Sequence, residues 1–345
     1  MPTLGEKALA LLATGRIANL PTVCSNVLAG FCLSSLLLSQ SDIGVFAQTA
    51  SITPLLFLML SCCLIYVAGC MLGDAVDHSF DLKNRPKRPI PLGILDAPRI
   101  RAASYLLFIV ALIILSLISP LTISLSQQPN HLYEGRATSI QTHEILLGCL
   151  LTMVVAGYAF HHKKNKAAAL TMMGSCRFLL VILAMSFAHK AGSEASPTPD
   201  QWLAPHLAWF GTLLIIPALG VGAYTILLSW VASTESKPGV FQSRNILTVM
   251  LLAVPLASIA VVSQMPSSFA FQHLSYSVAI TLCYLWMFSA IHALKKSKPI
   301  FVSKALAGFC LLDATFLAPF EPIAAAVCVA LFLVALGLQK IAPAT

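Results

Sequence analysis

The chain has 345 residues, of which 58% are hydrophobic and 10% are charged, with 21 Lys+Arg against 13 Asp+Glu and a net charge of +8. Soluble domains are about 45–50% apolar and about 25% charged, so the composition excludes a soluble globular fold, and its hydrophobicity excludes disorder. We expect an all-α polytopic membrane protein, because lipid satisfies no backbone polar group. The basic excess is typical of loops that face anionic lipid, and neither a nucleic-acid partner nor an obligate protein partner is expected.

Ten apolar runs are long enough to cross a bilayer, which takes about 20 residues of helix. They cover Ile17–Leu38, Thr49–Leu72, Ala102–Ile118, Glu144–Phe160, Ala168–His189, Leu207–Ala232, Ile246–Val262, Ser275–Leu294, Phe301–Leu317 and Ile323–Leu338. The whole chain, residues 1–345, is predicted to be a single transmembrane domain. Its ten cysteines lie in or beside these runs without a Cys-x-x-Cys pair, which indicates packing rather than a zinc or redox site.

Basic residues alternate between the two sides of the predicted bundle. One side carries Lys83, Arg85, Lys87, Arg88, Arg99, Arg101, Lys163, Lys164, Lys166, Lys237, Arg244, Lys295, Lys296, Lys298 and Lys340. The other side holds almost none, with Arg136 and Lys190 as the exceptions. The positive-inside rule therefore predicts a multi-pass protein of the cell (inner) membrane with its N-terminus in the cytoplasm.

Three acidic residues gather where the second run ends. Asp74, Asp77 and Asp81 are spaced i, i+3, i+7, which places three carboxylates on one face of a helix. Mg²⁺ favours such carboxylates together with phosphate oxygens, and cations suited to a diphosphate follow at Lys83, Arg85, Lys87 and Arg88. A solvated helix end without a role is the alternative, although three of the thirteen acids within eight positions weigh against it.

Two membrane families use aspartates of this kind. Gly73, Asp77 and Asp81 match the end of the CDP-alcohol phosphotransferase motif, but residues 61–70 contain neither the acid nor the arginine that this motif needs upstream. The segment Asp74-x2-Asp77-x3-Asp81, followed by Arg88-Pro89-Ile90-Pro91, resembles the first motif of the UbiA superfamily of intramembrane prenyltransferases. Gly73 departs from that motif, which has Asn at this position.

The resemblance extends to other parts of the chain. Arg16-x2-Asn19-x-Pro21 and Asn26 resemble the polar start of the family's first helix, and Tyr158 followed by Lys163 resembles the end of its fourth helix. It implies a core of nine transmembrane helices over about residues 16–317. The run over about residues 322–340 is then an added tenth helix.

The resemblance also implies an activity, the Mg²⁺-dependent transfer of an isoprenyl group from a prenyl diphosphate to an aromatic or other lipophilic acceptor within the membrane. Asp74, Asp77 and Asp81 are then the catalytic carboxylates and hold Mg²⁺. The expected substrate-binding residues are Arg16, Asn19, Asn26, Arg85, Arg88, Tyr158, Lys163 and Arg177.

The family's second acidic motif is reduced in this chain. Between Ser229 and Gly239, Glu235 is the sole acid, where the family usually has two aspartates. Three outcomes fit: a single-metal enzyme, a variant metal site that uses Glu235 with Lys237, or a protein that binds a polyprenyl phosphate as a carrier or accessory protein without transferring it. We favour transfer, and a secondary transporter ranks last.

Several polar residues lie inside or beside the predicted spans. Arg177 lies about midway along the fifth run, where a charge costs at least a few kcal/mol, so it either contacts substrate in the cavity or pairs within the protein. Asp313, in the ninth run, is expected to make a structural polar contact. His161 and His162 are expected to be interfacial rather than catalytic.

Overall fold

The computed structural model describes residues 3–38, 52–125, 137–191, 215–234, 244–262 and 273–341, and all regular structure within these ranges is helical. Short helices are α1 (Leu4–Thr14), η1 (Ile17–Asn19) and α4 (His78–Asn84). The remaining helices are α2 (Leu20–Leu38), α3 (Ile52–Val76), α5 (Ala97–Leu125), α6 (Ala137–His161), α7 (Lys166–Ala191), α9 (Ile215–Ala232), α10 (Arg244–Ala253), α11 (Ala257–Val262), α12 (His273–Leu294), α13 (Lys298–Leu317) and α14 (Pro322–Ile341).

Ten candidate spans have the length and composition to cross a membrane. This confirms an all-α, multi-pass membrane protein with a tenth span at its C-terminal end. One span differs from its sequence prediction, because the expected run Ile246–Val262 is divided into α10 and α11 by a turn around Pro255. Proline has no N–H to donate and its ring clashes with the preceding turn, so a continuous helix cannot pass through this position without a break or kink.

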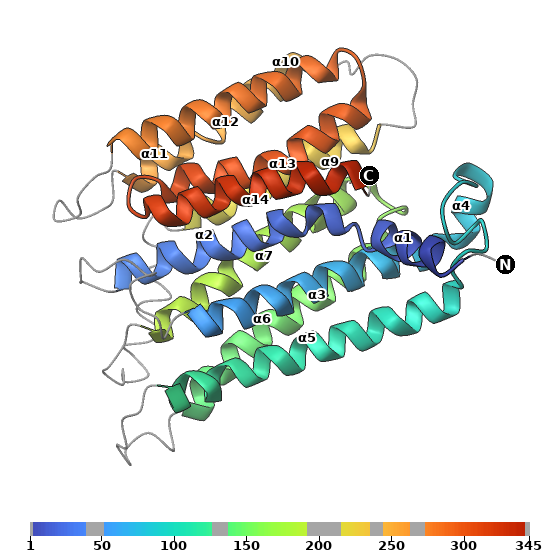
Figure 1. Cartoon of the computed structure of the whole chain (residues 1–345), viewed down its shortest axis with the longest axis horizontal. Coiled ribbons are helices and arrows are strands. Elements are labelled where there is room, and N and C mark those ends of the chain that lie inside the picture. Colours follow the sequence, from blue (N-terminus) through green and yellow to red (C-terminus); the bar gives the residue numbers. More distant parts are fainter. Residues whose placement is uncertain are drawn as a thin grey trace.

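The helices lie side by side along a common direction, with α1 and α4 at the end of the bundle where the N-terminus lies (Figure 1). Helices α2 and α13 are the most enclosed, with 83% and 78% of their spans buried. Helix α2 packs against α3, α7, α13 and α14. In contrast, α6 is only 22% buried, and its exposed leucines and methionine are suited to contact with lipid.

Small residues set the close helix crossings. A Cβ added to Gly174 of α7 would lie 3.0 Å from the backbone oxygen of Gly222 in α9, so the two backbones approach each other as small residues permit in membrane bundles. On α3, a Cβ on Gly69 would collide with Val155 of α6, whereas a Cβ on Gly73 would meet no atom within 4 Å. Only the first glycine of the Gly69-x3-Gly73 pair is therefore at a helix crossing.

A second, smaller apolar cluster lies at the N-terminal end of the bundle. It joins Ala10 of α1, Met71 and Ala75 of α3, and Ile90 and Leu95 of the segment that follows α4. Helix α1 begins with a capping box between Thr3 and Glu6, which satisfies orphan backbone donors at both residues. This cluster holds α1 and the loop over residues 85–96 against the end of α3.

Candidate active site

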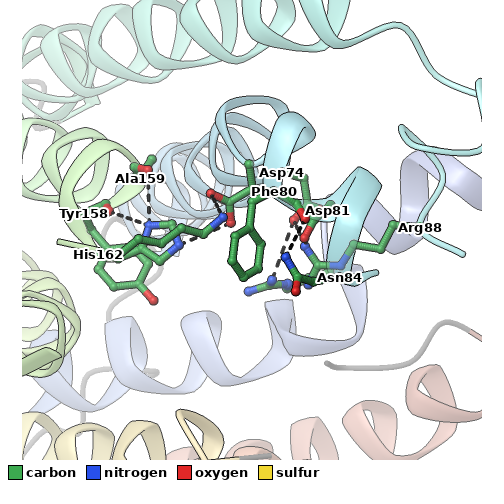
Figure 2. Close-up of polar contacts among 11 residues, drawn as sticks. Asp74, Phe80, Asp81, Asn84, Arg88, Tyr158, Ala159 and His162 are labelled. Carbon is green, nitrogen blue, oxygen red and sulfur yellow. Dashed lines mark hydrogen bonds and ion pairs between the residues drawn. The ribbon is translucent and has the colours of Figure 1, made fainter. Parts of the chain in front are cut away.

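The three aspartates lie at a bend between α3 and α4. Helix α3 ends at Val76 and α4 begins at His78, with Asp77 between them. The sequence predicts a single helical face, but the bend separates the carboxylates: Asp74 and Asp81 face one partner, while Asp77 faces the end of α6. Figure 2 shows Asp74, Asp81 and Arg88 on one side of Phe80 and His162 on the other.

Arg88 joins the first group. Its Nη1 donates to Asp74 Oδ1 at 3.0 Å and to Asp81 Oδ2 at 2.8 Å. The side chain of Asp81 is 2% exposed and that of Asp74 is 14% exposed. Buried carboxylates need a counter-charge, and one guanidinium nitrogen supplies it to both. Arg16 lies farther away, with its Nη2 3.8 Å from Asp74 Oδ1.

The loop fold explains why Arg88 reaches back to these aspartates. The backbone N–H of Arg88 donates to the carbonyl of Arg85, and the N–H groups of Ile94 and Leu95 donate to the carbonyl of Pro89. Gly93 has φ +73, a conformation that glycine adopts at no steric cost. With Ile90 and Leu95 buried in the small apolar cluster, the loop presents Arg88 to α3 and α4.

Asp77 belongs to the second group. Lys163 Nζ lies 2.7 Å from Asp77 Oδ1, and His162 Nε2 lies 3.2 Å from Asp77 Oδ2. Burial raises the pKa of Asp77, but hydrogen bonds from His162 and Lys163 and their positive charge outweigh it and hold the pKa below its usual value. The Lys163 ammonium also lies 3.7 Å from the centroid of the Phe80 ring, which adds a cation–π contact.

His162 is a site residue that sequence reasoning assigned to the interface. Its Nδ1 lies 3.1 Å from the carbonyl oxygen of Tyr158 and 3.2 Å from that of Ala159, while its Nε2 faces Asp77. Both ring nitrogens therefore face acceptors, and the hydrogen bond to Asp77 raises the pKa of His162. The signal in the sequence was the position of His162, one turn after Tyr158 and beside Lys163.

The remaining predicted residues at this end of the bundle differ in their contacts. Tyr158 stacks on His162 with ring centroids 5.1 Å apart. Arg85 is exposed, and within the described ranges it has no ion pair. Arg16 has φ 47, in the left-handed region, which is uncommon outside glycine and is often found at functional sites. Arg16 and Tyr158 thus flank the aspartates, whereas Arg85 pairs with none of them.

Arg177 and Asn26 lie inside the bundle and do not contact the three aspartates at the bend. Arg177 Nη1 donates to Asn26 Oδ1 at 2.6 Å and to the carbonyl of Thr22 at 3.1 Å, and its Nη2 donates to Thr22 Oγ1 at 2.9 Å. Asn26 Nδ2 in turn donates to Asp313 Oδ2 at 2.7 Å. In the structure Arg177 is paired within the protein, and its contact with substrate stays a prediction.

This interior network joins three helices. Asp313 of α13 also accepts from Ser25 Oγ of α2 at 2.6 Å, so the expectation of a structural polar contact for Asp313 is confirmed. Closer to the aspartates, Asn19 Nδ2 donates to Tyr66 Oη at 3.0 Å. Asn19 therefore lies between the interior network and the site at the bundle end, and its described bond is also to protein.

The donor set at the bend fits a divalent cation bound together with phosphate. Carboxylate oxygens of Asp74 and Asp81 converge on one cationic nitrogen, and the space at Gly73 beside them is open. Within the described ranges no three His, Cys, Asp or Glu side chains form a complete metal site. Substrate phosphate and water are common further ligands of Mg²⁺. Glu235, the predicted acid of the second motif, lies outside the described residues.

Comparison with known proteins gives the following matches. The family model described as the UbiA prenyltransferase family matches residues 11–127. A digeranylgeranylglyceryl phosphate synthase from Methanobrevibacter smithii is 37% identical over 77 residues, a match that covers 22% of this chain and 27% of that protein. A solved structure from a study of digeranylgeranylglyceryl phosphate synthase in membranes aligns with 96% of this chain and 99% of its own, with a TM-score of 0.50 and 16% identity. The structural match therefore shows a common fold over the whole chain.

Proposed function

We propose that this chain, whose residues 11–127 match the family model described as the UbiA prenyltransferase family, transfers an isoprenyl group from a prenyl diphosphate to a lipophilic acceptor, with Mg²⁺ as cofactor. The observation that carries this proposal is the convergence of Asp74 and Asp81 on the Arg88 guanidinium at the end of a lipid-embedded bundle. Carboxylates for a metal and an arginine for phosphate oxygens are then available at one point.

Each residue has a defined part in this proposal. Asp74 and Asp81 hold Mg²⁺, which when bound neutralises the charge of the leaving diphosphate. Asp77 faces Lys163 and His162 instead and orients Lys163 for the phosphate. Arg88, Lys163 and Arg16 surround the carboxylates and bind phosphate oxygens. Arg85, exposed on the same loop, closes over the diphosphate from the solvent side.

The apolar parts of the bundle accommodate the rest of the donor. A prenyl tail is a branched hydrocarbon, and it lies between helices near the open side of α3 at Gly73. The N-terminus and the site face the cytoplasm in this proposal, in accord with the basic residues at that end of the bundle. The name of the relative from M. smithii makes a geranylgeranyl donor with a glyceryl phosphate ether acceptor the first pair to test.

The test is diphosphate release by purified protein in lipid, with donor chain length and acceptor varied. Asp74→Asn and Asp81→Asn should each lower the rate about 100-fold, because each removes a ligand of the metal that would stabilise the developing negative charge. Asp96→Asn is the matched control, because Asp96 is an exposed acid after the same loop and pairs with Arg99. It should keep the full rate.

Two results would count against transfer. Metal-dependent binding of prenyl diphosphates that are never consumed would favour the polyprenyl-phosphate carrier or accessory protein instead. If the protein neither binds nor consumes prenyl diphosphates of any length, both candidate functions fail.

A further inference from the structure

We infer that Arg88 couples the binding of diphosphate to the binding of metal: it holds the carboxylates of Asp74 and Asp81 itself until a diphosphate draws it away. The inference rests on the proposed function and concerns the order of events at that site. It makes Arg88 a positioning residue for the metal ligands as well as a contact for phosphate.

The geometry supports competition for one position. A single nitrogen of Arg88 lies 3.0 Å from Asp74 Oδ1 and 2.8 Å from Asp81 Oδ2. A divalent ion bound by the same two oxygens would occupy the space between them, where Nη1 now lies. The guanidinium cannot give up its proton, so it must move if a cation is to bind both carboxylates.

Burial makes the contact with Arg88 costly to break without a replacement. Asp81 is 2% exposed, so water cannot compensate its charge, and a buried carboxylate that loses its cation is destabilised by several kcal/mol. Arg16 forms an ion pair with Asp74 at 3.8 Å, but within the described ranges Asp81 pairs with Arg88 alone. Metal alone must therefore displace Arg88 from both carboxylates, and this cost lowers its affinity.

A diphosphate lowers that cost because it offers the displaced guanidinium a new partner. Arginine binds phosphate oxygens in pairs of parallel hydrogen bonds. The Arg88 side chain is 22% exposed, more than either carboxylate that it holds, so it can turn toward a ligand on the solvent side. Lys163 and His162 meanwhile remain on Asp77. Diphosphate and metal then favour each other's binding by the same factor.

Mn²⁺ binding, followed by the magnetic resonance signal of the free ion, tests this coupling without any turnover. In the absence of substrate, Arg88→Gln should bind Mn²⁺ at least about fivefold more tightly than the wild type, the lower end of typical coupling between sites. Arg99→Gln is the matched control, because Arg99 is a 90% exposed cation that pairs only locally with Asp96. It should leave Mn²⁺ affinity unchanged.

A second titration adds farnesyl monophosphate, which chelates Mn²⁺ only weakly in solution and cannot release diphosphate. It should tighten Mn²⁺ binding to the wild type and have little effect on Arg88→Gln. If Arg88→Gln does not fold, Arg88→Lys replaces it. The shorter side chain of lysine places its nitrogen farther from the two carboxylates than Nη1 of Arg88, so Mn²⁺ should still bind more tightly than to the wild type.

The outcomes separate the two proposals. If Mn²⁺ binds the wild type and is lost in Asp74→Asn/Asp81→Asn, but binds folded Arg88→Gln equally or more weakly, the coupling is refuted and the metal site of the proposed function stands. If Mn²⁺ binds none of these proteins, with or without the monophosphate, the metal site fails, and both proposals fail with it.

Discussion

We expect the buried polar network that contains Arg177 and Asp313 to stabilise the folded protein. The two side chains are joined through Asn26, whose amide accepts from Arg177 at 2.6 Å and donates to Asp313 at 2.7 Å. Arg177 is 8% exposed and both Asn26 and Asp313 are 0% exposed. Arg177→Met keeps much of the side-chain volume but removes the cation from this network.

The expected loss follows from the contacts. Arg177 makes three hydrogen bonds to Thr22 and Asn26. At the average of about 0.6 kcal/mol measured for hydrogen bonds between membrane helices they sum to roughly 2 kcal/mol. The upper bound is the cost of about 3–5 kcal/mol for breaking a directly paired buried ion pair, because Arg177 reaches Asp313 only through Asn26. We therefore expect Arg177→Met to lower the free energy of unfolding by roughly 2–5 kcal/mol.

A double-mutant cycle separates the charge from the packing. Asp313→Asn keeps a group that can accept from Asn26 and Ser25, and it removes the negative charge. Once Arg177 is absent, Asp313→Asn removes a buried carboxylate that would otherwise have no counter-charge. The double variant should therefore be more stable than the sum of the single losses predicts, by at least about 1 kcal/mol.

The assay is reversible unfolding in mixed detergent micelles, with Arg177→Lys as the control that keeps the charge and loses the fork of donors. Strictly additive losses would show that Arg177 and Asp313 do not interact through Asn26. A stable Arg177→Met with an unchanged unfolding midpoint would refute the network as a source of stability altogether.

Two further predictions concern the end of α3 and its partner on α6. Gly73→Ala should raise the free energy of unfolding by up to about 1 kcal/mol, because alanine favours the helix and a Cβ there meets open space. Gly69→Ala should lower the free energy of unfolding, because its Cβ collides with Val155. Melting both variants in the same lipid tests the pair, and equal shifts in melting temperature would contradict the prediction. His162→Gln should destabilise the metal-free protein most between about pH 4 and 6.5, since the raised pKa of His162 and the lowered pKa of Asp77 favour their charged forms there. The His162–Asp77 contribution is present below the unfolded pKa of His162 and is lost as pH rises through its raised folded value, and it is lost again as pH falls through the lowered folded value of Asp77. A difference between wild type and His162→Gln that does not change from pH 5 to pH 9 would contradict this assignment.

The stretch from Asp74 to Arg88 shows which features of the candidate site a local sequence pattern can predict. The spacing of the aspartates and the arginine that follows them were sufficient to indicate a phosphate and metal site, because those residues lie within fifteen positions of one another. The pattern could not show that the helix bends at Asp77. It also could not show that Arg88 folds back onto two carboxylates while the third is held by α6.

The sequence by itself determined that this is a membrane protein with ten spans, since hydropathy over about 20 residues is a property of the chain alone. Only the tertiary structure decided which polar groups meet inside it. Arg177 and Asn26 are 151 residues apart, and Asn26 and Asp313 are 287 apart. The physical reason is that lipid is as apolar as the side chains between helices, so helix packing depends on close fit and on a few hydrogen bonds that leave no periodic signal in the sequence.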